Sequence, residues 1–79
     1  MSKYYQTVKE LINEMFGVEE DKILLTARLR EDLGLSEDDI LDLAMAIEDI
    51  YDISISDEEL HEDFQTVQDY VLHIIDFFS

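Results

Sequence analysis

The sequence predicts a small all-α protein, built as a four-helix bundle with three long helices and one short helix. Apolar residues recur with a period of about 3.6 in three stretches, as they do on the buried face of a helix. At three places a Ser or Thr precedes an acidic residue by three positions, a spacing typical of helix starts. With 79 residues there is material for one core, so residues 1–79 are expected to form a single domain.

The first helix is expected to cover residues 4–16 and to be followed by a long loop. Its apolar stripe consists of Tyr4, Tyr5, Val8, Leu11, Ile12, Met15 and Phe16. Gly17 suits the left-handed position at which many helices end. Residues 18–34 keep no helical period, although this segment has room for a helical turn. The loop is expected to anchor to the core through Ile23, Leu24, Leu25, Leu29 and Leu33.

A second helix is expected to begin at Ser36, because this serine and the acid three residues later resemble a capping box. Its inward stripe is predicted to be Ile40, Leu43, Ala44, Ile47, Ile50 and Tyr51. Two apolar residues, Leu41 and Met45, fall off this stripe. The acids on the same outer face are Asp38, Asp42 and Asp49. Single exposed apolar residues are common, so an ordinary surface is the alternative to a binding face.

The rest of the chain is expected to form a connector, a short third helix and a long fourth helix. Ile53 and Ile55 alternate with serines, but a strand there would lack a partner, so an extended connector is favoured. The capping pattern at Ser56 predicts a short helix that ends near Glu62. A further capping pattern begins at Thr66 and precedes the last helix. The stripe of that helix consists of Val67, Tyr70, Val71, Ile74, Ile75 and Phe78.

Charge is distributed unevenly along the chain. The formal net charge is −16, and every Lys and Arg lies within residues 1–30. The segment from residue 31 onward carries acids and no basic residue except histidine. Such a surface repels nucleic acid and anionic membranes and attracts basic proteins. We therefore expect neither nucleic acid nor a membrane as partner, with an acidic surface kept for solubility as the alternative.

Composition also indicates the cellular compartment. The chain has no cysteine, so nothing favours an oxidising environment. Its first residues lead into a pattern with regular polar positions, without the apolar run of a signal peptide or a membrane span. A cytoplasmic location is expected.

Catalytic and metal sites find little support in the sequence. His61 stands among acids and His73 lies beside an apolar stripe, positions at which most histidines are solvated or border the core. The acids lack the spacing of a calcium loop, and there is no glycine-rich phosphate loop. We therefore expect a protein that is not an enzyme and has no metal site. Ser36 remains, because a hydroxyl at the positive end of a helix is well placed to carry a phosphodiester; a plain helix cap is the alternative.

Several segments together resemble the acyl carrier protein family in order and spacing. They are Glu31–Gly34, Leu43–Glu48, Tyr51–Asp52, Ile55–Glu59 and Thr66–Tyr70. The resemblance covers nearly the whole chain. It implies a four-helix bundle in which a serine of an aspartate-serine-leucine motif receives 4'-phosphopantetheine, whose thiol carries acyl groups in fatty acid or polyketide biosynthesis. It also implies that partner enzymes read the second helix, where the matching positions are Asp39, Leu41, Asp42, Met45 and Glu48.

The sequence departs from the family at the attachment motif. In the ungapped register, aspartate-serine-leucine becomes Ser36-Glu37-Asp38, so Glu37 occupies the place of the attachment serine. Glutamate does not accept the arm in the usual phosphodiester linkage. A shift of one residue makes Ser36 the candidate attachment residue, but it turns the helix by about 100° and moves the partner-facing stripe. Ser36 as a cap in place of the family's aspartate avoids that shift.

Three functions are compatible with these features. The first is a carrier that uses Ser36 and docks on basic surfaces of acyl-transferring or synthase enzymes, after modification by a phosphopantetheinyl transferase. The second is a carrier-like protein that lacks the arm and serves as an acidic docking adaptor or regulatory subunit; Glu37 favours it. The third is an acidic decoy for a nucleic-acid-binding groove, which would need a duplex-like layout of charge that the helical pattern does not provide. We expect a monomer.

Overall fold

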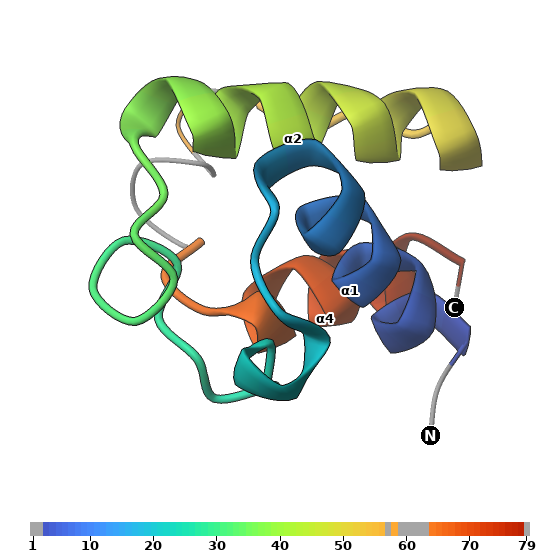
Figure 1. The fold of residues 1–79 in the computed structure, drawn as a ribbon. Coiled ribbons are helices and arrows are strands. Elements are labelled where there is room, and N and C mark those ends of the chain that lie inside the picture. Colours follow the sequence, from blue (N-terminus) through green and yellow to red (C-terminus); the bar gives the residue numbers. More distant parts are fainter. Residues whose placement is uncertain (1–2, 57, 59–63, 79) are drawn as a thin grey trace.

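Three α-helices surround one apolar core in the computed structural model, which describes residues 3–56, 58 and 64–78 (Figure 1). The helices are α1 (Lys3–Phe16), α2 (Glu37–Tyr51) and α4 (Val67–Phe78), and a 3-10 turn, η1 (Glu20–Lys22), follows α1. The described part is thus all-helical, as predicted. The short helix predicted between Ser56 and Glu62 falls largely on residues 57 and 59–63, which lie outside the described residues.

Helix α1 packs against both other helices and ends where the sequence predicts. Its buried residues are Tyr5, Val8 and Ile12. Gly17 adopts a φ of 72°, a left-handed conformation that glycine reaches without a steric penalty. The Gly17 amide donates a hydrogen bond of 2.9 Å to the Asn13 carbonyl and so closes the last turn.

The long loop between α1 and α2 is held to the start of α4 by backbone hydrogen bonds. Leu29 donates to the Gln65 carbonyl at 2.9 Å, and Val67 donates to the Ala27 carbonyl at 3.1 Å. Between them, Arg28 and Thr66 form an isolated antiparallel bridge. The loop's buried apolar residues are Ile23, Ala27, Leu29, Leu33 and Leu35. These hydrogen bonds and buried residues hold the loop in place, and the loop positions the start of α2 in space.

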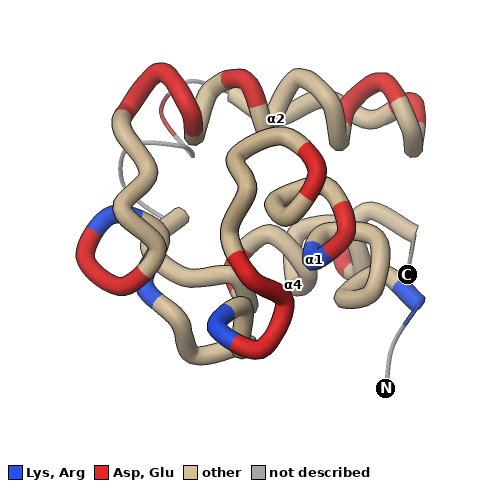
Figure 2. The backbone as a smooth tube through the Cα atoms, in the orientation of Figure 1, with Lys and Arg blue, Asp and Glu red and all other residues tan. Residues whose placement is uncertain are grey.

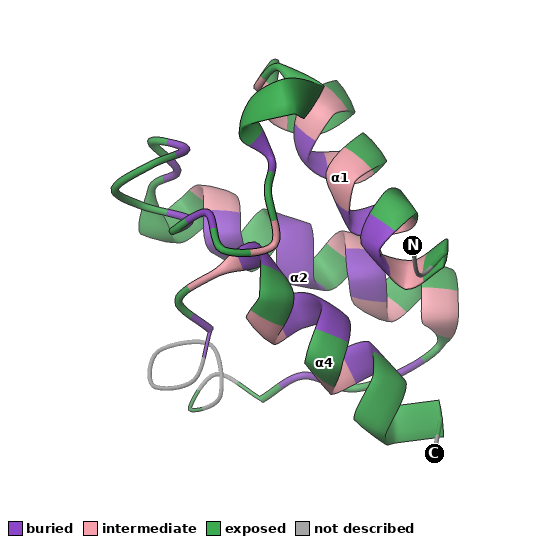
Figure 3. Cartoon of the chain, turned by 90° about the horizontal axis from the view of Figure 1, so that it is seen from below, coloured by how far each residue is buried: buried purple, intermediate pink, exposed green. Residues whose placement is uncertain are grey.

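Helix α2 lies across the top of α1 and α4 in Figure 1 and turns one face toward them. The residues it buries are Ile40, Leu43, Ala44 and Ile47. The Tyr70 hydroxyl of α4 donates a hydrogen bond of 2.9 Å to the Ile40 carbonyl and links the two helices. After α2, Ile53 and Ile55 are buried in a segment that forms neither helix nor strand, which agrees with the predicted connector. The burial pattern is visible from below in Figure 3.

Some residues predicted to line the core are exposed. They are Met15, Leu24, Ile50, Ile75 and Phe78. Four of them lie in or next to the last turn of a helix, where the neighbouring helices cover only part of the circumference. Tyr4, Tyr51 and Phe78 instead meet ring against ring at one end of the bundle, with centroids 5.6 to 6.2 Å apart. Leu24 lies in the loop between the buried Ile23 and the half-buried Leu25 and points outward.

Within the described residues, no helix combines the length and the apolar character needed to cross a membrane.

Candidate functional site

The corner that leads into α2 is built by a compact turn. Gly34 has a φ of 69°, and its amide donates to the Arg30 carbonyl at 3.1 Å. Leu33 and Leu35 on either side are buried, and the Leu35 amide donates to the Leu29 carbonyl at 3.0 Å. Open space surrounds a Cβ at Gly34, so the left-handed backbone, and no close contact, explains the glycine. Two buried anchors and this turn leave the next residue, Ser36, exposed at the surface.

Ser36 is the N-cap of α2 and forms a complete capping box with Asp39. The Asp39 amide donates to the Ser36 Oγ at 3.1 Å, and the Ser36 amide donates to Asp39 Oδ2 at 3.1 Å. The cap uses Ser36 Oγ as an acceptor and does not use the hydroxyl hydrogen. The residue thus combines an exposed hydroxyl with the positive end of the helix dipole, an arrangement that favours an attached anion. The helix dipole therefore favours a phosphodiester on Ser36, whereas the three acids of the first turn, Glu37, Asp38 and Asp39, oppose it.

Glu37, at the family's serine position, is the first residue of α2. Its Oε1 lies 3.4 Å from Nη2 of Arg30, and the two side chains are 69% and 49% exposed. Exposed ion pairs of this kind contribute between about 0 and 1 kcal/mol. Arg30 is therefore held only loosely, at one side of the Ser36 corner.

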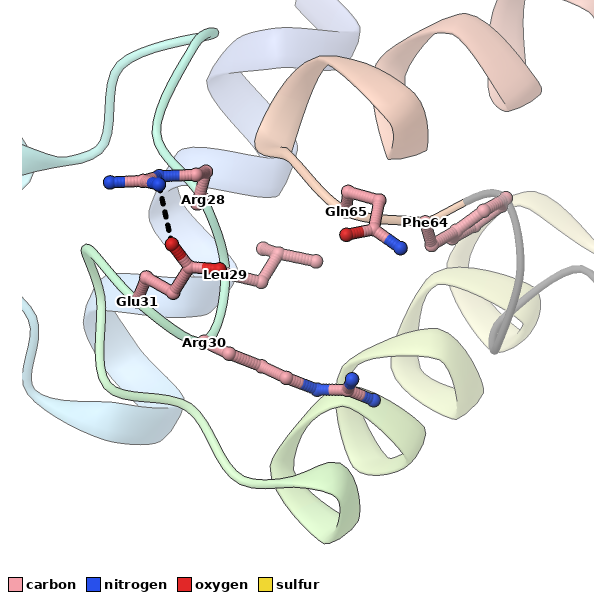
Figure 4. Close-up of a pocket in the computed structure, with 6 residues that line it drawn as sticks. All are labelled: Arg28, Leu29, Arg30, Glu31, Phe64 and Gln65. Atoms are coloured by element: carbon pink, nitrogen blue, oxygen red, sulfur yellow. Dashed lines mark ion pairs between the residues drawn. The ribbon is translucent and has the colours of Figure 1, made fainter.

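A hollow of about 70 Å³ lies between the loop that leads into this corner and the segment before α4. Its lining residues are Arg28, Leu29, Arg30, Glu31, Phe64 and Gln65. Figure 4 shows Arg30 extending from the loop across the hollow toward α2, while Arg28 is turned to Glu31. Pockets that bind a small-molecule substrate measure about 300 to 1,000 Å³, so this hollow does not enclose one.

Arg28 is engaged within its own loop. Its guanidinium pairs with Glu31. It also donates to both carboxylate oxygens of Asp32, at 3.2 Å in each case. The hydrogen bonds from Arg28 hold the pKa of the Asp32 carboxyl below its usual range, and the same contacts raise the pKa of Arg28. Arg28 and Asp32 together brace the turn that precedes the Ser36 corner.

The outer face of α2 carries acids and two apolar side chains. Leu41 is 42% exposed and Met45 is 58% exposed. The exposed acids of α2 are Glu37, Asp38, Asp42 and Asp49. Figure 2 shows this acidic character along the whole length of α2, with no basic residue on the helix. The structure thus brings Leu41, Asp42 and Met45 together on the surface, next to the Ser36 corner. We call these three residues the α2 docking patch.

Two other residues predicted for the same face have duties inside the protein. The Asp39 carboxylate belongs to the capping box. The Glu48 carboxylate accepts a hydrogen bond of 3.1 Å from the Ile55 amide and so holds the connector after α2. Both side chains are only partly exposed. Asp39 and Glu48 lie beside the α2 docking patch, and the fold uses their carboxylates.

The described residues hold no cluster of three His, Asp or Glu side chains placed to bind a metal ion. His73 Nε2 lies 3.4 Å from the Ser54 carbonyl, and its ring packs at 5.3 Å against Phe64. His73 therefore borders the core in a structural role. His61 lies outside the described residues.

Arg30 was not singled out by the sequence patterns. It is the last basic residue before 49 residues that contain no Lys or Arg, and this asymmetry was the available signal. Only the structure shows that the loop folds back and places Arg30 at the start of α2.

Comparison with known proteins gives a consistent result. A family model described as a phosphopantetheine attachment site matches residues 6–74. An acyl carrier protein from Phytoplasma australiense is 42% identical over 69 residues, which cover 87% of this chain and 90% of the relative. Acyl carrier proteins from Onion yellows phytoplasma (strain OY-M) and Aster yellows witches'-broom phytoplasma (strain AYWB) are each 40% identical over 70 residues, covering 89% of this chain and 91% of each relative.

Proposed function

The chain belongs to the acyl carrier protein family, and from this premise we propose that it presents an acyl group to partner enzymes on an arm attached to Ser36. Members of this family are carriers and not enzymes, and 4'-phosphopantetheine is the prosthetic group that membership implies. The proposal includes a single-domain four-helix bundle, a cytoplasmic location and a monomeric state.

The exposed hydroxyl of Ser36 at the start of α2 is the observation that carries this proposal. The buried Leu35 and the capping box fix the position of Ser36, so an arm attached there would leave from one defined point of the surface. When bound, the arm supplies a thiol that holds the acyl group as a thioester. The protein's own residues anchor the arm and keep it next to the surface that partners contact.

The α2 docking patch supports the second half of the proposal. Family membership implies that synthases and transferases are the partners. An apolar pair within an acidic face complements an enzyme surface that has a basic rim and an apolar centre. Asp42 and the neighbouring acids attract such a surface, and Leu41 and Met45 then lose water on contact. Acidic residues would thus set the rate of encounter, and the apolar pair would contribute most to the lifetime of the complex.

Glu37 favours a second candidate function, that of a carrier-like docking adaptor without an arm. In the ungapped register Glu37 stands at the family's serine position, and Ser36 is engaged as a helix cap. The adaptor would use the same α2 docking patch. The two functions therefore differ only in the covalent state of the corner, and one experiment separates them.

The experiment is the intact mass of the purified protein after incubation with coenzyme A and phosphopantetheinyl transferases, one of broad specificity and one from the same host. During loading, the Ser36 oxygen forms a P–O bond to the pantetheine-side phosphorus of coenzyme A, the P–O bond of the pyrophosphate bridge breaks, the hydroxyl proton leaves, and adenosine 3',5'-bisphosphate departs. The carrier function predicts the added mass of one arm, mapped to Ser36. An unchanged mass with both transferases contradicts it and supports the adaptor.

A matched pair of variants tests the register. Ser36→Asp removes the acceptor hydroxyl but keeps a good helix cap, so the fold should remain while labelling is lost. Glu37→Ser restores the acceptor position of the ungapped register. Labelling of Glu37→Ser in the absence of wild-type labelling assigns the loss of the arm to this single position.

A further inference from the structure

We propose that Arg30 is a positioning residue for the phosphodiester on Ser36, and that Glu37 competes with this anion for the Arg30 guanidinium. The proposal rests on the proposed attachment at Ser36. It concerns a residue of this chain that lies outside the attachment motif and outside the α2 docking patch.

Arg30 is the last positively charged side chain before α2. No Lys or Arg follows Arg30 in the sequence, so α2 and the rest of the chain contribute no such cation to the corner. Arg28, the nearest basic residue along the chain, is bound by Glu31 and Asp32. Among the described residues, Arg30 is the Lys or Arg within ion-pair distance of the first turn of α2.

The Arg30 side chain lies close to the start of α2. The Arg30 side chain lines the hollow and extends toward α2 (Figure 4). Its Nη2 lies 3.4 Å from Oε1 of Glu37, the first residue of α2. Ser36 is the immediate neighbour of Glu37. Glu37 is the partner that the structure gives Arg30 within its described part, and this contact occupies one of the five N–H donors of the guanidinium. The planar donor fork can pair with two oxygens of a phosphodiester, whereas it makes one contact of 3.4 Å to Glu37.

An anion on Ser36 would be repelled by the acids in the first turn of α2. An anion on Ser36 would lie beside three consecutive acids, Glu37, Asp38 and Asp39. The helix dipole offsets part of this repulsion, and a guanidinium that turns from Glu37 to the phosphodiester offsets more. Glu37 therefore holds Arg30 near the corner in the unloaded protein and gives it up, at a cost, in the loaded one. Glu37 slows loading on this account, and Arg30 assists it.

Labelling rates in a double-mutant cycle test the competition. Arg30→Gln should reduce the rate of labelling by coenzyme A and transferase by up to about fivefold, the effect of one exposed charge contact. Glu37→Gln should increase the rate, and this increase should vanish when Arg30→Gln is present. Asp38→Asn is the matched control, because it removes the same charge one residue further on; its effect should be the same with and without Arg30→Gln. The competition is contradicted if Arg30→Gln changes the effects of Glu37→Gln and Asp38→Asn on the labelling rate equally, or if it changes neither effect.

Nuclear magnetic resonance provides a readout that does not depend on the transferase. The chain contains two arginines, so their Nε–H signals are readily distinguished by the Arg30→Gln variant. Loading should move the Arg30 signal and leave the Arg28 signal in place, since Arg28 stays bound to Asp32. An Arg30 signal that does not change on loading overturns the proposal.

The positioning role of Arg30 can be tested even if Ser36 does not accept the arm. If wild-type protein stays unlabelled and Glu37→Ser is labelled, attachment at Ser36 is refuted, while Arg30 still lies within reach of position 37. Arg30→Gln should then reduce the labelling of Glu37→Ser by a similar factor. No reduction in that background refutes the positioning role of Arg30 by itself.

Discussion

At the scale of single residues, neighbouring side chains at the start of α2 have different structural and chemical roles. Ser36 caps α2 and offers a hydroxyl, while Glu37 takes up Arg30 at the adjacent position. Tyr70 has a purely structural duty: its ring is fully buried and packs at 4.6 Å against Phe64. Its hydroxyl donates to the Ile40 carbonyl in the first turn of α2. Tyr70 therefore ties α4 to the helix that carries the candidate site.

Replacing Tyr70 by phenylalanine should destabilise the protein. It should also make the free energy of unfolding less dependent on pH in the alkaline range. Loss of the hydrogen bond to Ile40 should lower the free energy of unfolding by about 1 kcal/mol near neutral pH. Burial raises the pKa of the Tyr70 hydroxyl well above its ordinary value. The unfolded chain then releases this proton from about pH 10 upward while the folded protein retains it, so wild-type stability falls as pH rises through this range.

Denaturant unfolding of wild type and Tyr70→Phe between about pH 8 and pH 11 measures both effects. The difference in unfolding free energy between the two proteins should shrink as pH rises, because only the unfolded wild-type chain is stabilised by ionisation of Tyr70. A difference that stays constant across the range would show that the hydroxyl is not held neutral by the fold.

At the scale of elements, α2 combines three roles on different sides of one helix. Its buried side supplies four core residues, and its first turn forms the Ser36 corner. Its outer side carries the α2 docking patch. Because these roles share one rigid helix, the corner and the patch keep a fixed distance and orientation. On the proposed function, a partner bound to the patch would therefore meet Ser36 in one geometry.

Elements with a regular apolar period and a capping pattern were predictable from the sequence. This holds for α2 and for α4, where the Asp69 carboxylate accepts from the amides of Gln65 and Thr66 at 2.7 and 2.9 Å. Helix α1 was predictable from its apolar period and from Gly17 at its end. Local rules also predicted the left-handed Gly17 and the exposure of Leu41 and Met45. Each of these features depends on residues within a few positions of one another, so sequence spacing contains the information.

Features that depend on distant segments were not predictable in this way. Ile50 continues the inward stripe of α2 but is exposed, whereas the Tyr4 and Phe78 rings, which come from other helices, pack on its neighbour Tyr51. The pairing of Arg30 with Glu37 depends on the turn at Gly34 and on the anchoring of the loop to α4. The use of the Glu48 carboxylate by Ile55 likewise depends on the path of the connector.

At the scale of the whole molecule, charge opposes compaction. A net charge of −16 on 79 residues produces mutual repulsion, and Figure 2 shows acids but no basic residue on α2. The described ion pairs involve only Arg28 and Arg30, and all their side chains are largely exposed. Local pairing therefore does little to offset the repulsion.

Salt should consequently stabilise the fold. Raising the ionic strength from about 0.01 M to about 0.15 M shortens the screening length from about 30 Å to about 8 Å, which weakens repulsion between acids on different elements. The melting temperature, followed by circular dichroism, should rise with salt. The double variant Asp42→Asn/Asp49→Asn should melt higher at low salt and gain less from added salt. A melting temperature that is independent of salt would show that repulsion between the acids is unimportant.

The most direct test of the account is the affinity of the protein for an acyl-transferring synthase that depends on acyl carrier proteins. We expect Leu41→Ala/Met45→Ala to weaken binding by at least about tenfold, because an apolar anchor at the centre of an interface contributes more than about 1 kcal/mol. Leu72→Ala is the matched control, since Leu72 is 47% exposed on α4, close to the 42% of Leu41 on α2. Calorimetry should find unchanged affinity for Leu72→Ala. Equal losses for both variants, or a loss only for Leu72→Ala, would contradict the claim that partners read the outer face of α2.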